Sequence, residues 1–422
     1  MKRSFFRLAI LAAVLPGGCN AQQLRQARLD VQHQAIAGPN VALASRFNTL
    51  PLVEPHISAH PGNNDHLLAA AMVVTDINRP YESCRLTSFV SSNGGASWKE
   101  TVHDWWGYDP WTAIAENGAA VMSWIGTKGS FQDQYPIQFF TSTDGGASWE
   151  SSVQTLPGMY DGTKLAPGAG IFYFATVRFR ESEGADVVLY SSAKAGDFVE
   201  LAAIDGKGER LNFCEPAIRR DGKVIVPYTS RDGAWVQIYD PETHKLSTKV
   251  NITTRTDGQR GYARLVVDEG GKSAFRDHVY YVRGLGNSGL VVNRSVDAGT
   301  IWEKEVRVDL LESSEDRNAL VPSAAINFGG VLAISWVNQQ DNNEVYFTAS
   351  LDGGVSFVRP VRLAPKGSNP RTQRNGDVAN KFPGGGHYLG LTARADGTFQ
   401  AIWSDSRNGF FQLQSCNIRL VP

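Results

Sequence analysis

An eight-residue pattern, Ser-x-Asp-Gly-Gly-x-Ser-Trp in its fullest form, recurs four times along the 422 residues of this chain. The first two copies start 51 residues apart, and the second and third start 153 residues apart, three times that interval. A repeat of this length indicates one supersecondary unit that is copied around or along an axis. The four copies are Ser91–Trp98, Ser142–Trp149, Ser295–Trp302 and Ser350–Phe357.

The residues of the pattern are those of a hairpin turn. An Asp or Asn side chain bonds backbone amides two residues further on, and the glycines adopt the positive φ of a tight turn. The closing Trp or Phe begins the next strand with a large apolar side chain. Because the segments between the turns are short and carry no long helical period, we predict an all-β chain.

The pattern is similar to the Asp box, and the chain resembles the Asp-box (BNR-repeat) proteins, whose best-known enzymes are the sialidases. The resemblance covers roughly residues 50–420 and implies a β-propeller of four-stranded blades. In that family the box is a structural turn on the face opposite the active site. Seven similar units can be drawn along the chain, so we favour seven blades. Six blades are the alternative, because the sialidases have six.

Three segments are expected. Residues 1–21 read as a signal peptide, because three cationic side chains precede an apolar run that is too short to span a bilayer. Either cleavage follows Ala21, or Cys19 ends an imperfect lipoprotein box and becomes the lipidated N-terminus. Both readings predict an exported protein, which is secreted, periplasmic or an outer-surface lipoprotein. Residues 22–50 are expected to form a linker and a closing strand, and residues 51–422 the propeller.

The charge balance and the motifs exclude several classes of function. A formal net charge of −1 argues against binding driven by bulk charge to nucleic acid or to an anionic membrane. We therefore expect membrane contact only through a lipid on Cys19. The remaining cysteines have no metal-type spacing, and phosphate-loop, zinc-helix and nucleophile-elbow motifs are missing, so we expect no cofactor and no metal.

Acidic residues recur at the expected starts of the inner strands, at intervals of 55, 52 and 54 residues. Glycoside hydrolysis commonly needs two carboxyl groups, one protonated and one ionised, and a separation across a channel would favour an inverting geometry. The alternative is that each residue only caps a strand. Tyrosine and histidine at equivalent positions are further candidates for proton transfer or sugar stacking. The candidates are Glu54, Asp109, Asp161, Glu215, Tyr262, His387 and Tyr388.

Arginines are frequent in the loops that should open on the same face. Their planar forks suit carboxylates, so several of them together would bind an acidic substrate such as a sialic or uronic acid. The alternative is that they pair with neighbouring carboxylates and hold the loops. These residues are Arg79, Arg178, Arg231, Arg283 and Arg407.

The segment Cys214–Arg231 looks like the sialidase segment in which a catalytic Glu opens an inner strand. The resemblance implies that Glu215 acts as base toward a tyrosine nucleophile and that Arg231 clamps the sugar carboxylate. Asp76 would supply the acid, with Glu82 as the alternative. Three sialidase features are missing: an arginine on the first inner strand, a third clamping arginine ahead of Ser295, and the tyrosine itself near 318–323.

Together these features predict an exported glycoside hydrolase of sialidase type that acts on terminal acidic sugars of glycans. The incomplete catalytic set favours a different hypothesis, a non-catalytic propeller that binds carbohydrate or protein. A scaffold in an envelope complex is a third hypothesis, which lipidation of Cys19 would support.

Overall fold

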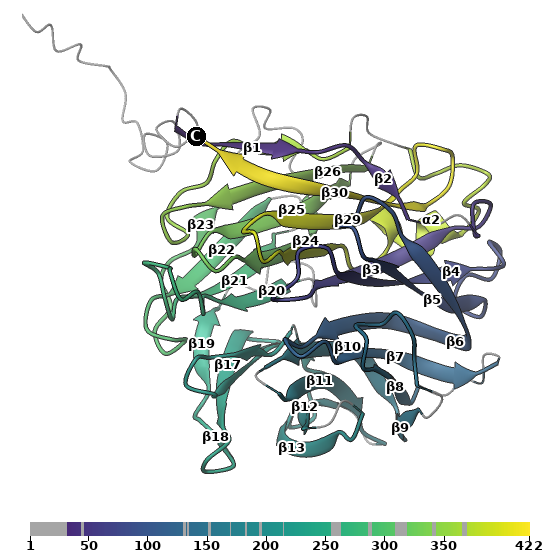
Figure 1. Ribbon diagram of the computed structural model, residues 1–422. Coiled ribbons are helices and arrows are strands. Elements are labelled where there is room, and N and C mark those ends of the chain that lie inside the picture. Colours follow the sequence, from purple (N-terminus) through teal and green to yellow (C-terminus); the bar gives the residue numbers. More distant parts are fainter. Residues whose placement is uncertain are drawn as a thin grey trace, which may run out of the picture.

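The computed structural model describes residues 32–43, 46–129, 132, 135–150, 153–168, 170–181, 184–193, 196–213, 215–254, 263–285, 289–308, 319–339, 343–364 and 369–422. Antiparallel strands dominate these residues, as Figure 1 shows, and the predicted all-β class is confirmed. Helix is limited to short pieces such as α2 (Val378–Lys381) and the 3₁₀ turn that follows it (Pro383–Gly385). In the described part of the chain, none of the helices has the length and apolar character needed to cross a membrane.

The first sheet has seven strands in the order β3 to β9, each antiparallel to the next. Strand β6 is 16 residues long; its first part pairs with β5 and its second part with β7. It therefore links two four-stranded groups. The strands are β3 (Leu52–Ala59), β4 (Leu67–Val74), β5 (Cys84–Ser91), β6 (Lys99–Ile114), β7 (Ala120–Lys128), β8 (Ile137–Ser142) and β9 (Gln154–Leu156).

Four further antiparallel sheets follow along the chain. The first comprises β10 (Tyr160–Pro167), β11 (Phe172–Phe179), β12 (Ala185–Ser192) and β13 (Val199–Ile204). The second comprises β14 (Asn212–Phe213), β15 (Ala217–Ile218), β16 (Val224–Ser230), β17 (Gly233–Asp240), β18 (Lys245–Leu246) and β19 (Val250–Thr253). The third comprises β20 (Ala263–Val267), β21 (Val279–Gly284), β22 (Leu290–Ser295) and β23 (Val306–Arg307). The fourth comprises β24 (Ala319–Ile326), β25 (Leu332–Gln339), β26 (Asn343–Ser350) and β27 (Val361–Arg362).

The last sheet joins the two ends of the described chain. It holds β28 (Gly390–Ala393), β29 (Phe399–Asp405) and β30 (Gln412–Val421), and β30 pairs with β1 (Gln34–Ala37) and β2 (Val41–Ala42). The register of β1 runs from Gln34 opposite Val421 to Ala37 opposite Ile418. The N-terminal strands thereby cover an edge of β30 that would otherwise be open to pairing with another chain (Figure 1).

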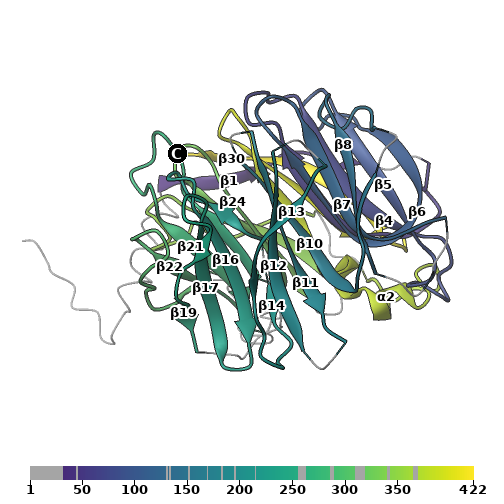
Figure 2. The ribbon, with the colours of Figure 1, turned by 90° about the horizontal axis from the view of Figure 1, so that it is seen from below.

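One strand of each group takes part in a closed cycle of contacts. Strand β3 contacts β6, β6 contacts β10, β10 contacts β15, β15 contacts β20, β20 contacts β24, β24 contacts β28, and β28 contacts β3 again. Figure 2 shows several of the sheets standing side by side. The grouping is the one that seven blades would give, although the blade number itself stays a prediction.

Apolar side chains fill the spaces between neighbouring sheets. Phe139 of β8 stacks on Phe198 at 4.2 Å between ring centroids and meets Phe174 of β11 edge-on at 5.0 Å. All three are buried, so this cluster holds the sheet that contains β8 against the sheet that contains β11. Packing of this kind fixes the angular position of each sheet, and with it the strand ends that build the functional face.

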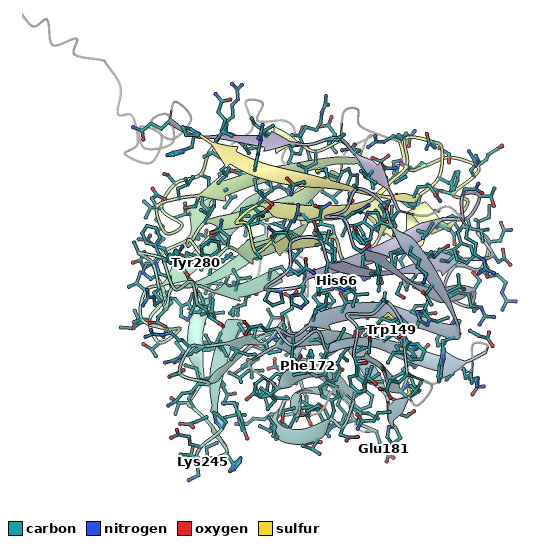
Figure 3. The ribbon with its side chains drawn as sticks, viewed as in Figure 1. His66, Trp149, Phe172, Glu181, Lys245 and Tyr280 are labelled. Atoms are coloured by element: carbon teal, nitrogen blue, oxygen red, sulfur yellow. The ribbon has the colours of Figure 1, made fainter. Side chains whose placement is uncertain are left out.

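The four copies of the sequence pattern form the same hydrogen-bonded turn. In the second copy, the Ser142 hydroxyl donates to Asp144 at 2.7 Å and accepts the Gly146 N–H at 2.8 Å, while Asp144 also accepts the Ser148 N–H at 2.8 Å. Equivalent bonds begin at Ser91, Ser295 and Ser350. Two residues labelled in Figure 3 belong to the second turn or contact it. Trp149 ends the pattern, and the His66 ring hydrogen-bonds with the Gly145 carbonyl. Because His66 lies in the β3–β4 connection, these turns are at the opposite end of the sheets from Glu54.

Candidate active site

Three inner strands are interrupted at equivalent positions, and each interruption carries a carboxyl group. The pairing register shifts between Val53 and His56 in β3, between Tyr108 and Trp111 in β6, and between Asp161 and Lys164 in β10. Within these bulges φ is 55° at Glu54 and 51° at Asp109, a conformation that is uncommon for residues other than glycine. Bulges re-aim side chains, and strained backbone of this kind gathers at functional sites.

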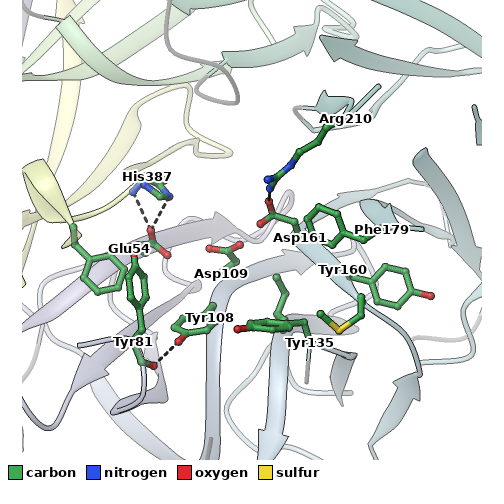
Figure 4. Close-up of a pocket in the computed structure, with 13 residues that line it drawn as sticks. Glu54, Tyr81, Tyr108, Asp109, Tyr135, Tyr160, Asp161, Phe179, Arg210 and His387 are labelled. Carbon is green, nitrogen blue, oxygen red and sulfur yellow. Dashed lines mark hydrogen bonds and ion pairs between the residues drawn. The ribbon is translucent and has the colours of Figure 1, made fainter. Parts of the chain in front are cut away.

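The three carboxyl groups face a pocket of about 280 Å³ (Figure 4). Its walls combine these acids with aromatic rings, a guanidinium group and an imidazole. The lining residues are Glu54, Tyr81, Tyr108, Asp109, Ile125, Tyr135, Met159, Tyr160, Asp161, Phe179, Arg210, Phe382 and His387. The sequence placed Glu54, Asp109, Asp161 and His387 at one mouth of the ring, and the structure brings these four together.

Glu54 and Asp109 form a buried carboxyl pair. The two residues are only 1% and 8% exposed, and each carboxyl group influences the pKa of the other. Burial is the main reason that the pKa of each is raised, and for Asp109 the Glu54 charge raises the pKa further. Two like charges in one buried site repel each other, so this pair favours a state with one proton.

His387 completes the environment of this pair. Its backbone N–H donates to Glu54 Oε1 at 3.1 Å, and its ring Nδ1 lies 3.4 Å from the same oxygen. Burial lowers the pKa of the imidazole, which favours the neutral ring near pH 7. The His387 ring can therefore share a proton with Glu54 without adding a fixed positive charge.

Asp161 and Arg210 form an ion pair on another wall of the pocket. Arg210 Nη2 lies 2.9 Å from Asp161 Oδ2, and the side chains are 64% and 47% exposed. The guanidinium also lies 4.8 Å from the centroid of the Phe179 ring. In Figure 4 the Asp161 carboxylate faces the space into which Asp109 also points. Asp161 is thus the more solvated carboxylate of the site.

Aromatic rings make up most of the remaining wall. The Tyr108 hydroxyl donates to the Tyr81 carbonyl, and the Tyr81 ring meets Phe382 edge-on at 5.3 Å. Burial is the largest of the causes that raise the pKa of the Tyr108 hydroxyl, so Tyr108 is a neutral donor and not a phenolate nucleophile. Rings of this kind, next to acids, suit the apolar face and the hydroxyl groups of a sugar.

A second polar layer lies behind the pocket. Lys164 Nζ is 3.7 Å from the centroid of the Trp111 ring and 3.5 Å from that of Tyr388. His56 stacks on Trp111 at 3.7 Å, and Glu215 Oε1 lies 3.5 Å from Arg264 Nε. Glu215 and Tyr388, both predicted as site residues, therefore belong to this layer and not to the pocket wall.

The predicted arginines mostly pair with nearby carboxylates, which is the alternative that the sequence left open. Arg178 pairs with Glu200, Arg283 with Glu305 and Arg407 with Asp405. Arg79 and Asp76 are exposed in the β4–β5 loop, outside the pocket lining. Arg231 is exposed beyond the end of β16. On β16, Tyr228 pairs with Phe213 and Ile225 pairs with Ala217, so Glu215 lies level with the residues between Ile225 and Tyr228. Arg231 comes after that stretch and is not opposite Glu215. Tyr262 lies outside the described residues.

Several lining residues were not among the predicted site residues. Tyr108 and Tyr160 directly precede predicted acids, so their places next to Asp109 and Asp161 were available signals. Lys164, which lies behind the pocket wall, also carried a signal, because it is a charged residue in a mostly buried strand. Tyr81 and Arg210 come from connecting segments, and nothing in their sequence context indicates the pocket. In the described residues, no group of three or more His, Cys, Asp or Glu side chains is arranged to hold a metal ion.

No known protein family matches this chain. No curated protein matches it either. Among solved structures, a Dyadobacter fermentans protein of unknown function is similar over 92% of this chain and 99% of its own length, with 13% identity and a TM-score of 0.53. The GH93 α-L-arabinofuranosidase of Fusarium graminearum, in complex with arabinobiose, covers 91% and 98%, with 11% identity and a TM-score of 0.50. A NanB sialidase variant from Streptococcus pneumoniae covers 90% and 70%, with 11% identity and a TM-score of 0.49. The first two likenesses show the fold alone: the chain is a β-propeller, as its resemblance to the Asp-box proteins predicted.

Proposed function

We propose that this protein is a glycoside hydrolase whose acid is the Glu54–Asp109 pair. The single observation that carries the proposal is this pair of buried carboxyl groups, which line an aromatic pocket and have raised pKa values. A carboxyl group that keeps its proton near neutral pH can protonate a glycosidic oxygen. Asp161, the more exposed carboxylate facing the same space, is the second acidic group that this chemistry requires.

The proposed reaction uses the two acidic sites in opposite roles. The protonated member of the Glu54–Asp109 pair donates its proton to the glycosidic oxygen, and the bond from that oxygen to the anomeric carbon breaks. Asp161 takes a proton from a water molecule as the water oxygen attacks the anomeric carbon. The products are a free sugar and an alcohol, and the proton gained by Asp161 restores the pair through solvent. Attack on the opposite face inverts the anomeric configuration, which NMR of the first product would reveal.

The wall chemistry favours an uncharged terminal sugar. Three carboxyl groups line the pocket, and Arg210, the guanidinium among its described lining residues, already pairs with Asp161. An anionic sugar would have to compete with Asp161 for Arg210 and would approach the charge of the carboxyl pair. The GH93 enzyme of similar fold was captured with arabinobiose, a neutral disaccharide, and this supports the same choice.

A terminal acidic sugar, as the sequence suggested, is the second candidate. It is favoured by the exposure of Arg210, whose side chain is 64% accessible and could turn toward a sugar carboxylate. Under this alternative, Arg210→Ala would abolish release of a sialic or uronic acid. For a neutral sugar the same change should affect KM modestly, because only the Asp161 partner is lost.

The test is a release assay on aryl glycosides of arabinofuranose, common neutral hexoses, sialic acid and glucuronic acid. We expect the wild type to release a neutral sugar, and Glu54→Gln to lower kcat about 10²- to 10⁴-fold. The matched control is Glu242→Gln, because Glu242 is exposed in the β17–β18 turn. If no sugar is released but a glycan array shows binding that survives Glu54→Gln, the protein is a binding propeller and the enzyme proposal is wrong.

We also propose export, on the basis of residues 1–21. Mass spectrometry of the purified protein from a bacterial host separates the two processing routes. Cleavage after Ala21 leaves a free N-terminus at Gln22, whereas lipidation leaves an acylated Cys19 and is lost in Cys19→Ser. A protein that retains Met1 in the cytosolic fraction would contradict both.

A further inference from the structure

Two cations are buried in one aromatic cage behind the pocket. Lys164 of β10 and Arg264 of β20 are each only 2% exposed. Lys164 Nζ lies over the faces of both the Trp111 and the Tyr388 ring, and the Arg264 guanidinium carbon is 5.2 Å and 5.6 Å from the same two ring centroids. The Lys164 ammonium has no hydrogen-bond partner among the described residues. The ring faces are therefore direct contacts of this ammonium.

The chain connects this cage directly to the carboxyl pair. Trp111 comes two residues after Asp109 on β6, and the Thr163 hydroxyl, next to Lys164, donates to the Asp109 carbonyl. Tyr388 follows His387, whose N–H donates to Glu54. Burial has the largest effect on the pKa of Glu54 and of Asp109. Among the smaller effects, the positive charge of Lys164 lowers both pKa values.

The charges of the two layers are complementary. When Lys164 is protonated, Lys164 and Arg264 carry two positive charges and Glu215, beside Arg264, carries one negative charge, which leaves an excess of one positive charge. The Glu54–Asp109 pair carries one negative charge when it shares a single proton. Uncompensated charge is costly inside a protein. The excess positive charge around Lys164 therefore stabilises the singly protonated Glu54–Asp109 pair, and the negative charge of that pair stabilises protonated Lys164.

We propose that Lys164 is a positioning residue whose buried ammonium keeps the Glu54–Asp109 pair at one shared proton. One carboxyl group of the pair can then donate its proton while its partner remains ionised. Without this cation, two carboxyl groups in so buried a site would hold a second proton. The meaning of this role for catalysis rests on the proposed function, but the protonation itself can be measured without any substrate.

Other charged and titratable groups also face the pair, and they set the background against which Lys164 acts. Burial, followed by repulsion from Arg264, lowers the pKa of Lys164 to about 7, so its full charge is present only in more acidic solution. The groups near the pair are Tyr81 before β5, Cys84 at the start of β5, Asp161 on β10, and His387 with Tyr388 before β28. His56 on β3, Glu215 before β15 and Arg264 on β20 lie near Lys164 or near one another.

The direct test follows the Asp109 carboxyl carbon by ¹³C NMR while pH is varied, with the signal assigned by its loss in Asp109→Asn. In Lys164→Met the midpoint of the step in which the pair takes up its second proton should move upward by about one pH unit or more. Lys164→Arg keeps the charge and should stay near the wild type. Lys245→Met is the control, because Lys245 is exposed on β18 (Figure 3). An unmoved midpoint in Lys164→Met, or an equal shift in Lys164→Arg, would overturn the proposal.

A second readout ties the role to turnover. The acid limb of the kcat/KM profile should move upward in Lys164→Met by the same amount as the NMR midpoint, and should not move in Lys245→Met. If the wild type releases no sugar, the proposed function fails while the NMR result still decides the role of Lys164. If Lys164→Met does not fold, Lys164→Gln replaces it. If Lys164→Met and Lys164→Gln both fail to fold while Lys164→Arg folds, the positive charge is needed for stability alone, and the proposed role in protonation is rejected.

Discussion

Glu54 and Asp109 combine two unfavourable features that support each other. Both have positive φ, at 55° and 51°, and both bury a carboxyl group. A glycine would relieve the backbone, and an apolar side chain would avoid the burial of a polar group. Neither alternative would place a shared proton at the wall of the pocket. The strain and the raised pKa values therefore belong to one arrangement, in which the bulge aims each acid at the other.

This arrangement predicts how Asp109→Asn changes stability with pH. Burial raises the pKa of Asp109 well above its usual range, so the folded protein keeps a proton that the unfolded chain releases above about pH 4. That stabilisation is complete below the unfolded pKa and is lost as pH rises through the folded pKa. Asn does not ionise, so the variant should gain stability relative to the wild type as pH rises above about 4 and up to the raised pKa of the folded Asp109.

Urea denaturation across this pH range measures the difference. Asp221→Asn, in the exposed turn before β16 and outside the pocket lining, is the matched control for an Asp-to-Asn change. A constant offset between Asp109→Asn and the wild type at every pH would contradict the buried, protonated pair.

The four repeated turns contribute to stability at the end of the sheets away from the pocket. In the third copy, the Ser295 hydroxyl is fully buried, donates to Asp297 at 2.6 Å and accepts the Gly299 N–H at 2.9 Å. Ser295→Ala leaves that N–H without its partner, which costs about 1–3 kcal/mol of unfolding free energy. Chemical denaturation gives the value, and kcat/KM of the folded variant should equal that of the wild type. Lost activity without lost stability would place the turn in the site.

Closure of the ring depends on the pairing of β1 and β2 with β30. Removal of residues 1–43 uncovers the β30 edge, loses several backbone hydrogen bonds and exposes the buried side chain of Cys416 and its neighbours. We expect Tm to fall by roughly 5–10 °C, and we expect self-association through the open edge. Calorimetry and light scattering measure both effects. Removal of residues 1–31 is the matched control, since it leaves β1 in place, and an equal fall in Tm there would contradict the closure role.

The sequence predicted the parts of this molecule that local chemistry determines. Periodic turns gave the propeller, and their phase placed Glu54, Asp109 and Asp161 at strand starts on one face. The arginines were harder to place, because a loop arginine such as Arg178 or Arg407 is held by whichever carboxylate lies nearest in space. Tyr81 and Arg210 join the pocket only through the path of long connections. The Lys164 cage depends on the relative rotation of sheets, which periodicity does not encode.

Leaving-group dependence tests the central claim, that the Glu54–Asp109 pair is the acid of a glycoside hydrolase. A 2,4-dinitrophenyl glycoside departs without protonation, whereas an alkyl glycoside needs the acid. We predict that Glu54→Gln lowers kcat about 10²- to 10⁴-fold on the alkyl glycoside and by far less on the dinitrophenyl glycoside of the same sugar. Equal losses on the two substrates, or full activity on both, would contradict the account.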